Sequence, residues 1–172
     1  MSAPLRRVAV RRPGLSMIEA DPSDWHYGPS FDPTLVVAQH DNFTACLVDA
    51  GCDVLWMEDD DKAIADAVFT YDASLVTPAG AILMSPGKSK RHGEQDLHKG
   101  FFASHDIPVC GEIAGEGRAE AGDTLWLDDT VLAAGRGFRT NATGIAQLTN
   151  LMKSMGVEVL GFDLPHYLGV EA

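Results

Sequence analysis

One order of chemically distinctive residues occurs twice in this chain and constrains the fold more than any other feature. In each copy, an acidic residue precedes two short strand patterns joined by a turn, and a loop with arginine follows them. A helical pattern and a final strand complete the copy. The first copy extends from Asp66 to Cys110 and the second from Asp123 to Leu160. A repeat of roughly 50 residues predicts a propeller or a solenoid, because one such unit cannot bury its apolar face alone.

Apolar spacing and turn residues predict the elements of both copies. In the first copy, strands are expected over 75–76, 81–84 and 107–110, with a helix over 93–104 that buries Leu97, Phe101 and Phe102. In the second copy, strands are expected over 124–127, 131–134 and 157–160, with a helix whose apolar stripe is Ile145, Leu148, Met152 and Met155. Arginine loops are expected at 90–92 and 135–139. Since each copy has a carboxylate before its hairpin and arginine after it, these charges should meet at one centre.

The N-terminal part of the chain shows a looser version of the same unit. Strands are expected over 7–11 and 52–57, with a helix between them that begins at Asp32 and Pro33 and ends at Gly51. The helix should bury Val36, Phe43, Leu47 and Ala50. With no linker in sight, we expect residues 1–172 to form one domain of three modules, at approximately 5–60, 61–112 and 113–172.

Charge and cysteine usage exclude several classes of function. The formal net charge of -12 and the pI of about 4.7 argue against nucleic acid and an anionic membrane as partners. The three cysteines form no C-x-x-C motif, which favours a reducing, cytoplasmic setting. The histidines lack metal-ligand spacing, so no metal is expected. The glycine pairs at 115–117 and 135–137 lack the strand, helix and lysine of a phosphate loop, so no cofactor is expected.

Three such modules would leave strand edges unpaired and a centre half built, because radial repeats protect their edges by closing the ring. We therefore expect the 172 residues to be part of a longer fold.

A series of short motifs resembles the pentein superfamily of guanidine-modifying enzymes, which holds dimethylargininase, arginine deiminase and the amidinotransferases. The matching segments, in order, are 10–14, 25–29, 39–40, 66–72, 120–123, 137–141 and 163–166. The bacterial dimethylargininase-like branch is the most similar. This resemblance implies a pentein-type α/β propeller of five ββαβ modules around an axial active site, with about three of the five in this chain.

The resemblance also implies roles for five residues. Asp72 would hold the substrate guanidinium, whose paired N–H groups suit a carboxylate, and Asp66 would supply a further acidic contact. Arg91 and Arg139 would bind the substrate's carboxylate or shape the site near it. Glu120 would orient the catalytic histidine. Asp123, in contrast, is expected to be a turn or strand-end residue.

Two positions depart from the family pattern. Tyr71 occupies a place that varies between branches, so the resemblance does not fix the substrate. Ala121 replaces the first glycine of the usual Glu-Gly-Gly-Asp, and would be strained if that position required a positive φ.

The implied reaction is attack of a cysteine thiolate on the guanidinium carbon, release of an amine, and hydrolysis of the covalent intermediate, with a histidine as acid and base. In the family both groups lie beyond the position of Ala172. Cys46, Cys52 and Cys110 are interpreted as inert packing residues, and His166 precedes the catalytic histidine.

The sequence thus predicts a hydrolase that converts dimethylarginine to citrulline and an amine, with a small cationic guanidine as partner and, in addition, a homo-oligomer or complementing chain. Two alternatives remain open. One is an arginine deiminase or amidinotransferase, and the other is an inactive fragment that binds a cationic ligand or a partner chain.

Overall fold

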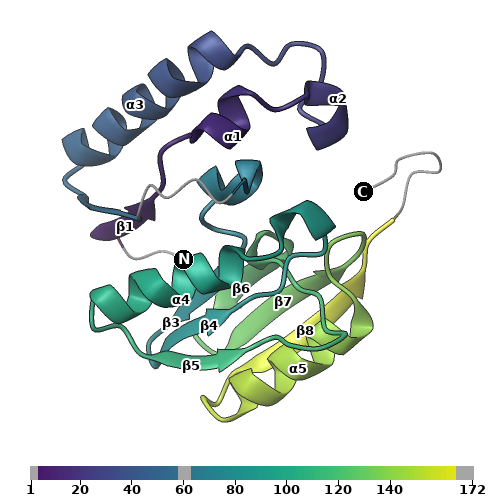
Figure 1. Ribbon diagram of the computed structural model, residues 1–172. Coiled ribbons are helices and arrows are strands. Elements are labelled where there is room, and N and C mark those ends of the chain that lie inside the picture. Colours follow the sequence, from purple (N-terminus) through teal and green to yellow (C-terminus); the bar gives the residue numbers. More distant parts are fainter. Residues whose placement is uncertain (1–3, 58–62, 166–172) are drawn as a thin grey trace. The chain divides into compact units, whose positions relative to one another are not determined.

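The computed structural model describes residues 4–57 and 63–165, and the chain divides into two compact units, 2–70 and 71–172 (Figure 1). Each unit is described by itself below. Among the described residues, no helix combines the length and the apolar character needed to cross a bilayer.

The unit of residues 71–172 contains both copies of the repeat. In the first, β3 (Ser74–Thr77) pairs antiparallel with β4 (Gly80–Leu83), and helix α4 (Glu94–Ser104) leads to β5 (Val109–Glu112), which lies parallel to β4. In the second, β6 (Thr124–Asp128) pairs with β7 (Val131–Arg136), and α5 (Ala142–Lys153) leads to β8 (Glu158–Asp163). The sheet orders are β3-β4-β5 and β6-β7-β8. The predicted order of strand, strand, helix and strand is confirmed in both copies.

Two short 3₁₀ helices lie beside the hairpins of this unit. They are η2 (Ser89–Arg91), which follows β4, and η3 (Ala121–Asp123), which leads into β6. Arg91 is the last residue of η2, and Glu120 directly precedes η3.

Local chemistry explains where the strands and helices begin. Asn141 caps α5 by accepting a hydrogen bond from the Gly144 N–H at 2.7 Å. The strand β5 begins two residues later than expected because Pro108 has no N–H to donate, although its carbonyl still accepts from the Ala81 N–H at 2.8 Å. The strand β7 extends to Arg136, which therefore lies in the strand and not in the predicted loop.

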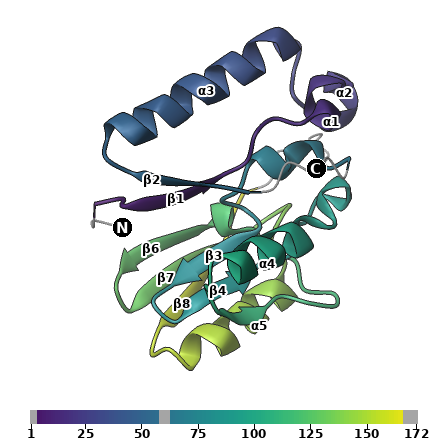
Figure 2. The same ribbon diagram turned by 60° about the vertical axis from the view of Figure 1, so that its left-hand side comes forward.

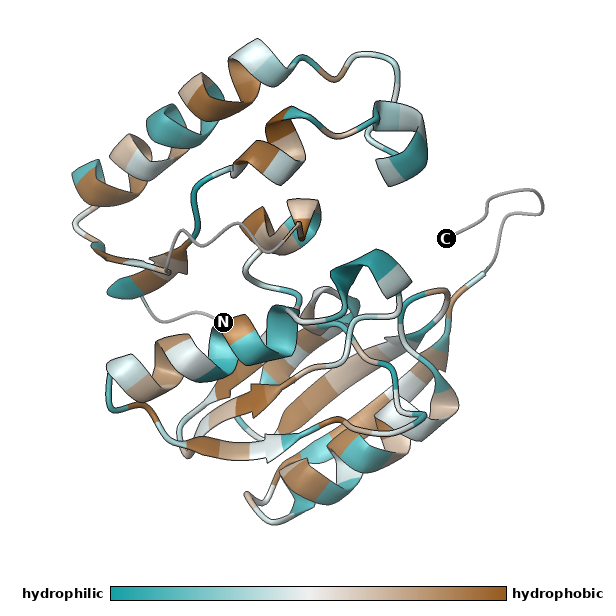
Figure 3. Cartoon of the chain, in the orientation of Figure 1, coloured by the Kyte–Doolittle hydropathy of each residue, from teal (hydrophilic) through white to brown (hydrophobic). Residues whose placement is uncertain are grey.

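The two sheets share one hydrophobic core. Its buried members come from β3, β4, β7, α5 and the loops before β6: Leu75, Ile82, Met84, Ile113, Ala119, Ala121, Leu132, Leu148 and Met152. The apolar strands of this unit are brown in Figure 3. Because neither copy buries its apolar face alone, the second copy completes the first, as expected of adjacent repeats. In α4, Phe101 and Phe102 are buried and Leu97 is half-buried.

The unit of residues 2–70 has a two-stranded parallel sheet of β1 (Arg7–Val10) and β2 (Asp53–Trp56). Between the strands lie α1 (Leu15–Ile18), α2 (Pro22–Trp25) and α3 (Pro33–Asp49), and η1 (Ala65–Val68) follows β2. The predicted start of α3 is confirmed, since the Asp32 carboxylate accepts from the Thr34 N–H at 2.8 Å. Gly51, with φ of +83°, follows its end.

The predicted buried face of α3 is partly wrong. Val36 and Leu47 are half-buried, but Phe43 and Ala50 are exposed. The face that packs inward is rotated toward Thr44, which is buried and donates its hydroxyl to the His40 carbonyl at 2.9 Å. A polar side chain could take this place because it satisfies its hydrogen bond within the helix. Figure 2 shows α3 running along β2, which it contacts.

Candidate functional site

Four of the five predicted site residues lie in the unit of residues 71–172, at the ends of the two hairpins. Asp72 precedes β3 and Arg91 closes η2 after β4. Glu120 precedes η3, and Arg139 lies in the loop after β7. Acid and arginine thus flank both hairpins, and the structure brings all four together. The acid of the second hairpin is Glu120, however, and not Asp123, with which the second copy was expected to open.

Arg91 is the centre of this group. Its Nη1 lies 2.7 Å from Asp72 Oδ2 and 3.7 Å from Glu120 Oε2, so one guanidinium faces acids of both repeats. The Arg91 side chain is 4% exposed, whereas that of Asp72 is 23% exposed. Of this pair, Asp72 is therefore the member that solvent can reach.

Glu120 lies between the two arginines. Its Oε1 is 3.8 Å from Arg139 Nη1 and accepts a hydrogen bond from the Gly87 N–H at 3.1 Å. Burial raises the pKa of Glu120, the charge of Asp72 raises it further, and the two arginines and the Gly87 N–H offset this only in part. A carboxyl with a raised pKa beside a second acid is well suited to exchange protons or accept a cation.

Arg91 has a further partner, Glu94, that sequence reasoning missed. Arg91 donates from Nε to Oε1 and from Nη2 to Oε2 of Glu94, both at 2.8 Å. Glu94 is 1% exposed. Burial by itself would lower the pKa of Arg91, but the hydrogen bonds and charges of Glu94 and Asp72 outweigh burial and raise it. The sequence contains a signal for this pair, because an acid three residues after an arginine has the spacing of a helical ion pair. Such a pair at a helix start is usually solvated, so the spacing alone does not predict that Glu94 is buried.

The glycine that the site requires is the second of its motif, not the first. Ala121 is fully buried, is not among the described non-glycine residues with positive φ, and donates its N–H to the Asp72 carbonyl at 2.9 Å. The strain considered for alanine is therefore not found. A side chain at Gly122, in contrast, would overlap the Asp72 carboxylate.

Asp123 fixes the backbone beside Glu120. The Thr140 hydroxyl donates to Asp123 Oδ2 at 2.6 Å and accepts from the Glu120 N–H at 3.1 Å. Asp123 is thus a structural residue at the end of η3, as expected.

Asp66 belongs to the unit of residues 2–70, where it lies in η1. It is 5% exposed and accepts a hydrogen bond from the Tyr27 hydroxyl at 2.8 Å. The Tyr27 ring packs between those of Trp25 and Phe31, with centroid separations of 6.3 and 4.8 Å. The aromatic segment 25–31 therefore holds the Asp66 carboxylate in place through the Tyr27 hydroxyl.

The three cysteines are unpaired. Cys52 is buried, and the half-buried Cys110 donates its thiol to the Ala81 carbonyl at 3.3 Å, which fits a packing role. Cys46 was expected to be buried and is exposed, because it lies on the outer face of α3. His166 and the acidic run 58–61 lie outside the described residues. Within those residues, no group of three His, Cys, Asp or Glu side chains could hold a metal.

An open cavity of about 310 Å³ lies beside Arg91 but does not include Asp72, Glu120 or Arg139. Its lining includes Arg118, whose guanidinium donates to the carbonyls of Gly115 and Gly117 at 2.8 and 2.6 Å. This arginine supports the loop before β6, and of the charged group only Arg91 lines the cavity.

Two ββαβ repeats that join acids and arginines at one end define the class: a pentein-type α/β protein related to guanidine-modifying enzymes. The family model described as arginine deiminase matches residues 62–166, more than half of the chain. The chain belongs to the arginine deiminase family.

Two curated relatives are N(G),N(G)-dimethylarginine dimethylaminohydrolases. That of Pseudomonas aeruginosa is 26% identical over 88% of this chain and 58% of its own length. That of Streptomyces coelicolor is 27% identical over 98% of this chain and 64% of its own length. The chain thus spans about three fifths of these relatives.

Solved structures agree in fold. A dimethylarginine dimethylaminohydrolase mutant from Pseudomonas aeruginosa, complexed with citrulline, has a TM-score of 0.82 at 24% identity over 96% of this chain and 64% of that one. A second mutant dimethylarginine dimethylaminohydrolase, an adduct with S-methyl-L-thiocitrulline, has a TM-score of 0.81 at 26% identity over 96% and 63%. The N-terminal domain of a cyanobacterial arginine dihydrolase has a TM-score of 0.75 at 21% identity over 93% and 58%.

Proposed function

We propose that this chain supplies the guanidinium-binding part of a hydrolase that converts methylated arginine to citrulline and an amine. The observation that supports this most is the acidic surrounding of Arg91. Carboxylate oxygens of Asp72, Glu94 and Glu120 lie 2.7, 2.8 and 3.7 Å from the Arg91 guanidinium, and the Asp72 side chain is 23% exposed. A guanidinium guest carries one positive charge and planar paired donors, which suit such a carboxylate.

The residues have distinct proposed roles. Asp72 accepts the guest guanidinium, since its carboxylate is the more exposed acid of the group. Glu120, whose pKa is raised by burial, orients the group that moves protons. Arg139, 29% exposed, binds the guest's carboxylate.

The proposed reaction begins when a cysteine thiolate attacks the guanidinium carbon and the amine leaves with a proton from a histidine. Water then hydrolyses the carbon–sulfur intermediate, which gives citrulline and restores the thiolate. We assign no nucleophile among the cysteines of the chain, because the thiols of Cys110 and Cys52 donate to the carbonyls of Ala81 and Leu5, and Cys46 lies on the exposed face of α3. No cofactor is required, and the unpaired cysteines favour a reducing, cytoplasmic setting.

The test has two parts. Calorimetry on the 172-residue chain should detect binding of Nω,Nω-dimethyl-L-arginine, and Asp72→Asn should weaken it by roughly 10–100-fold, the value of one charge-assisted hydrogen bond. Asp129→Asn removes an exposed turn carboxylate and should leave binding unchanged. The full-length product of the gene should release citrulline. No binding and no turnover with any arginine derivative would refute the proposal.

An arginine deiminase is the second candidate, favoured by the family model that matches residues 62–166. Unmethylated arginine would then give ammonia in place of dimethylamine, so measuring which amine appears with citrulline separates the two. Transfer of the amidino group to an added amine would instead indicate an amidinotransferase. Binding by the full-length product without turnover would indicate a protein that only binds cationic ligands.

A further inference from the structure

We propose that Glu94 is a positioning residue, which fixes the Arg91 guanidinium so that its Nη1 presets the carboxylates of Asp72 and Glu120 for a cationic guest. The inference rests on the proposed function and adds a residue to it.

The geometry of the pair makes it a rigid unit. Two parallel hydrogen bonds of 2.8 Å join the Nε and Nη2 edge of Arg91 to both oxygens of Glu94. Because the guanidinium is planar, fixing this edge also fixes the direction of Nη1 on the other side. That atom lies 2.7 Å from Asp72 Oδ2. Glu94 thus acts on the position of Asp72 through Arg91.

Glu94 also lies on a well-packed helix. It is the first residue of α4, and that helix is secured by the buried Phe101 and Phe102 and by contacts with β4. A residue on such an element holds its side chain more precisely than one in a loop.

The general preference for acidic residues at a helix start does not explain why Glu94 is buried and paired. Such acids favour the positive end of the helix dipole and are usually solvated. Asp96, in the same first turn, fits this description because it is exposed. Glu94 is 1% exposed and directs both oxygens to one side chain. Burial of a charge at this depth is costly unless it is paired and hydrogen-bonded, so Glu94 depends on Arg91.

The main test follows the Arg91 Nε–H by nitrogen-15 NMR without ligand. In the 172-residue chain this proton should exchange with water at least tenfold more slowly than those of exposed arginines. Asp72→Asn should leave it protected, because Glu94 and not Asp72 holds that edge. Glu94→Gln should remove the protection, and Asp96→Asn, the matched loss of a first-turn charge, should not.

Each result decides the question. Loss of protection in Asp72→Asn, or its persistence in a folded Glu94→Gln, would overturn the proposal. Should Glu94→Gln fail to fold, Glu94→Asp keeps the charge on a shorter side chain and should speed exchange at least tenfold. An unchanged rate in that variant would likewise overturn it.

The second test uses Nω,Nω-dimethyl-L-arginine as the probe in a double-mutant cycle. Glu94→Gln should weaken binding at least tenfold in the parent chain, but less than twofold when Arg91→Lys is already present. A loss of equal size in both backgrounds would mean that Glu94 does not act through Arg91. If the parent chain binds no guanidine compound, the proposed function fails while the NMR result still decides the role of Glu94.

Discussion

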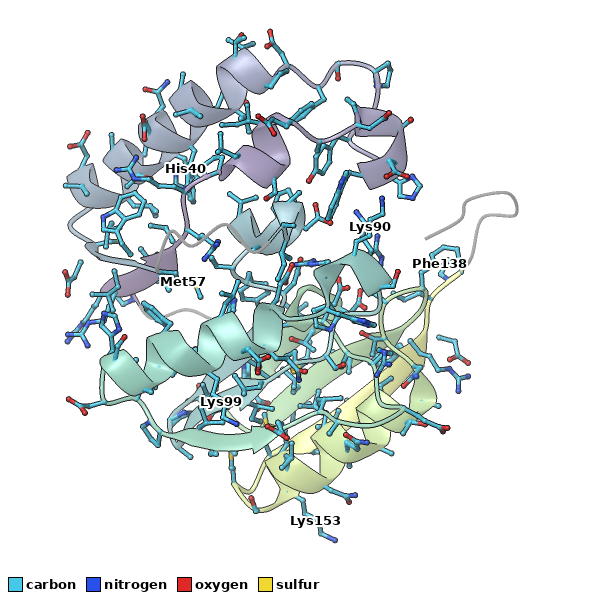
Figure 4. The ribbon with its side chains drawn as sticks, in the orientation of Figure 1. His40, Met57, Lys90, Lys99, Phe138 and Lys153 are labelled. Carbon is cyan, nitrogen blue, oxygen red and sulfur yellow. The ribbon has the colours of Figure 1, made fainter. Side chains whose placement is uncertain are left out.

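Arg91 and Arg139 occupy the same place in two repeats, yet their surroundings differ. Each lies in the loop after the second strand of its hairpin, and each precedes the first residue of the following helix by three positions. That residue is Glu94 in α4 and Ala142 in α5. The side chains are 4% and 29% exposed. Figure 4 labels Lys90 and Phe138, which directly precede the two arginines and locate both loops.

The difference shows how a repeated fold comes to hold unlike charges. The ββαβ pattern supplies two equivalent positions for arginine, and one residue at each helix start sets what the arginine can do. With a carboxylate there, Arg91 is paired and buried. With alanine, Arg139 has one acidic contact among the described residues, at 3.8 Å from Glu120, and is 29% exposed to a ligand.

The largest expected contrast is in stability. Arg91→Met would leave Glu94 buried without its cation, and removing one partner of a buried pair costs about 3–5 kcal/mol. Arg139→Met should cost at most about 1 kcal/mol, since its contact is long and partly solvated. Urea denaturation of the two variants and the parent chain measures both. Equal losses would show that the two positions are energetically alike.

A second contrast concerns Gly87 and Gly122, two glycines at which one repeat packs closely against the other. A methyl group at Gly87 would overlap the backbone of Arg139, whereas one at Gly122 would overlap the carboxylate of Asp72. Because backbone cannot rotate away, Gly87→Ala should destabilise by about 1–3 kcal/mol. Gly122→Ala should cost less stability but weaken dimethylarginine binding roughly tenfold, by about 1.4 kcal/mol.

The control for both glycines is Gly137→Ala, since a methyl group there would meet only Leu164 at ordinary contact distance. Thermal denaturation and calorimetry together separate the two effects. Unchanged ligand affinity in Gly122→Ala would mean that Asp72 tolerates displacement.

The third contrast is in pH dependence. Burial raises the pKa of Glu120 above its ordinary 4.5, so the folded chain keeps this proton at a pH where the unfolded chain has lost it. Relative to Glu120→Gln, the parent chain should therefore lose stability as the pH rises from about 4.5 through the raised pKa. Guanidinium binding should strengthen over the same interval, because the carboxylate forms there.

For the exposed Asp128, we expect the opposite change of stability with pH. Hydrogen bonds from the Thr130 N–H and hydroxyl lower its pKa, so its contribution is present above 3.8 and is lost as the pH falls. Denaturation of Glu120→Gln and Asp128→Asn across this pH range tests both. A parent chain and Glu120→Gln with parallel profiles would contradict the assignment for Glu120.

The sequence predicted much of this arrangement because the relevant signals are local. The hairpins and both later helices follow from apolar period and turn residues, and the meeting of acid with arginine follows from their repeated order around the hairpins. The residue Glu94 escaped prediction because its spacing from Arg91 fits an exposed helical ion pair equally well. Only the packing around α4 shows that it is buried.

Two further points depended on three-dimensional proximity. The need for glycine at 122 arises from Asp72, which is distant in sequence and approaches only after both repeats have packed. The predicted buried face of α3 was partly wrong because the Thr44 hydroxyl donates to a carbonyl within the helix. Thr44 can therefore be buried where an apolar residue was expected. Periodicity detects apolar faces and cannot detect such a polar member.

The smallest expected effect is also the most direct test of the comparison. Ala142→Glu places a carboxylate where the second repeat lacks one, three residues after Arg139. Because Ala142 and Arg139 are both partly or fully exposed, stability should change by no more than about 0.5 kcal/mol. The new carboxylate should nevertheless compete for the guanidinium of Arg139 and weaken dimethylarginine binding by about 2–5-fold, or roughly 0.4–1 kcal/mol. Ala142→Gln, which adds similar bulk without charge, is the matched control. If both variants bind as tightly as the parent chain, the identity of the first helical residue does not explain why one arginine is buried and the other accessible.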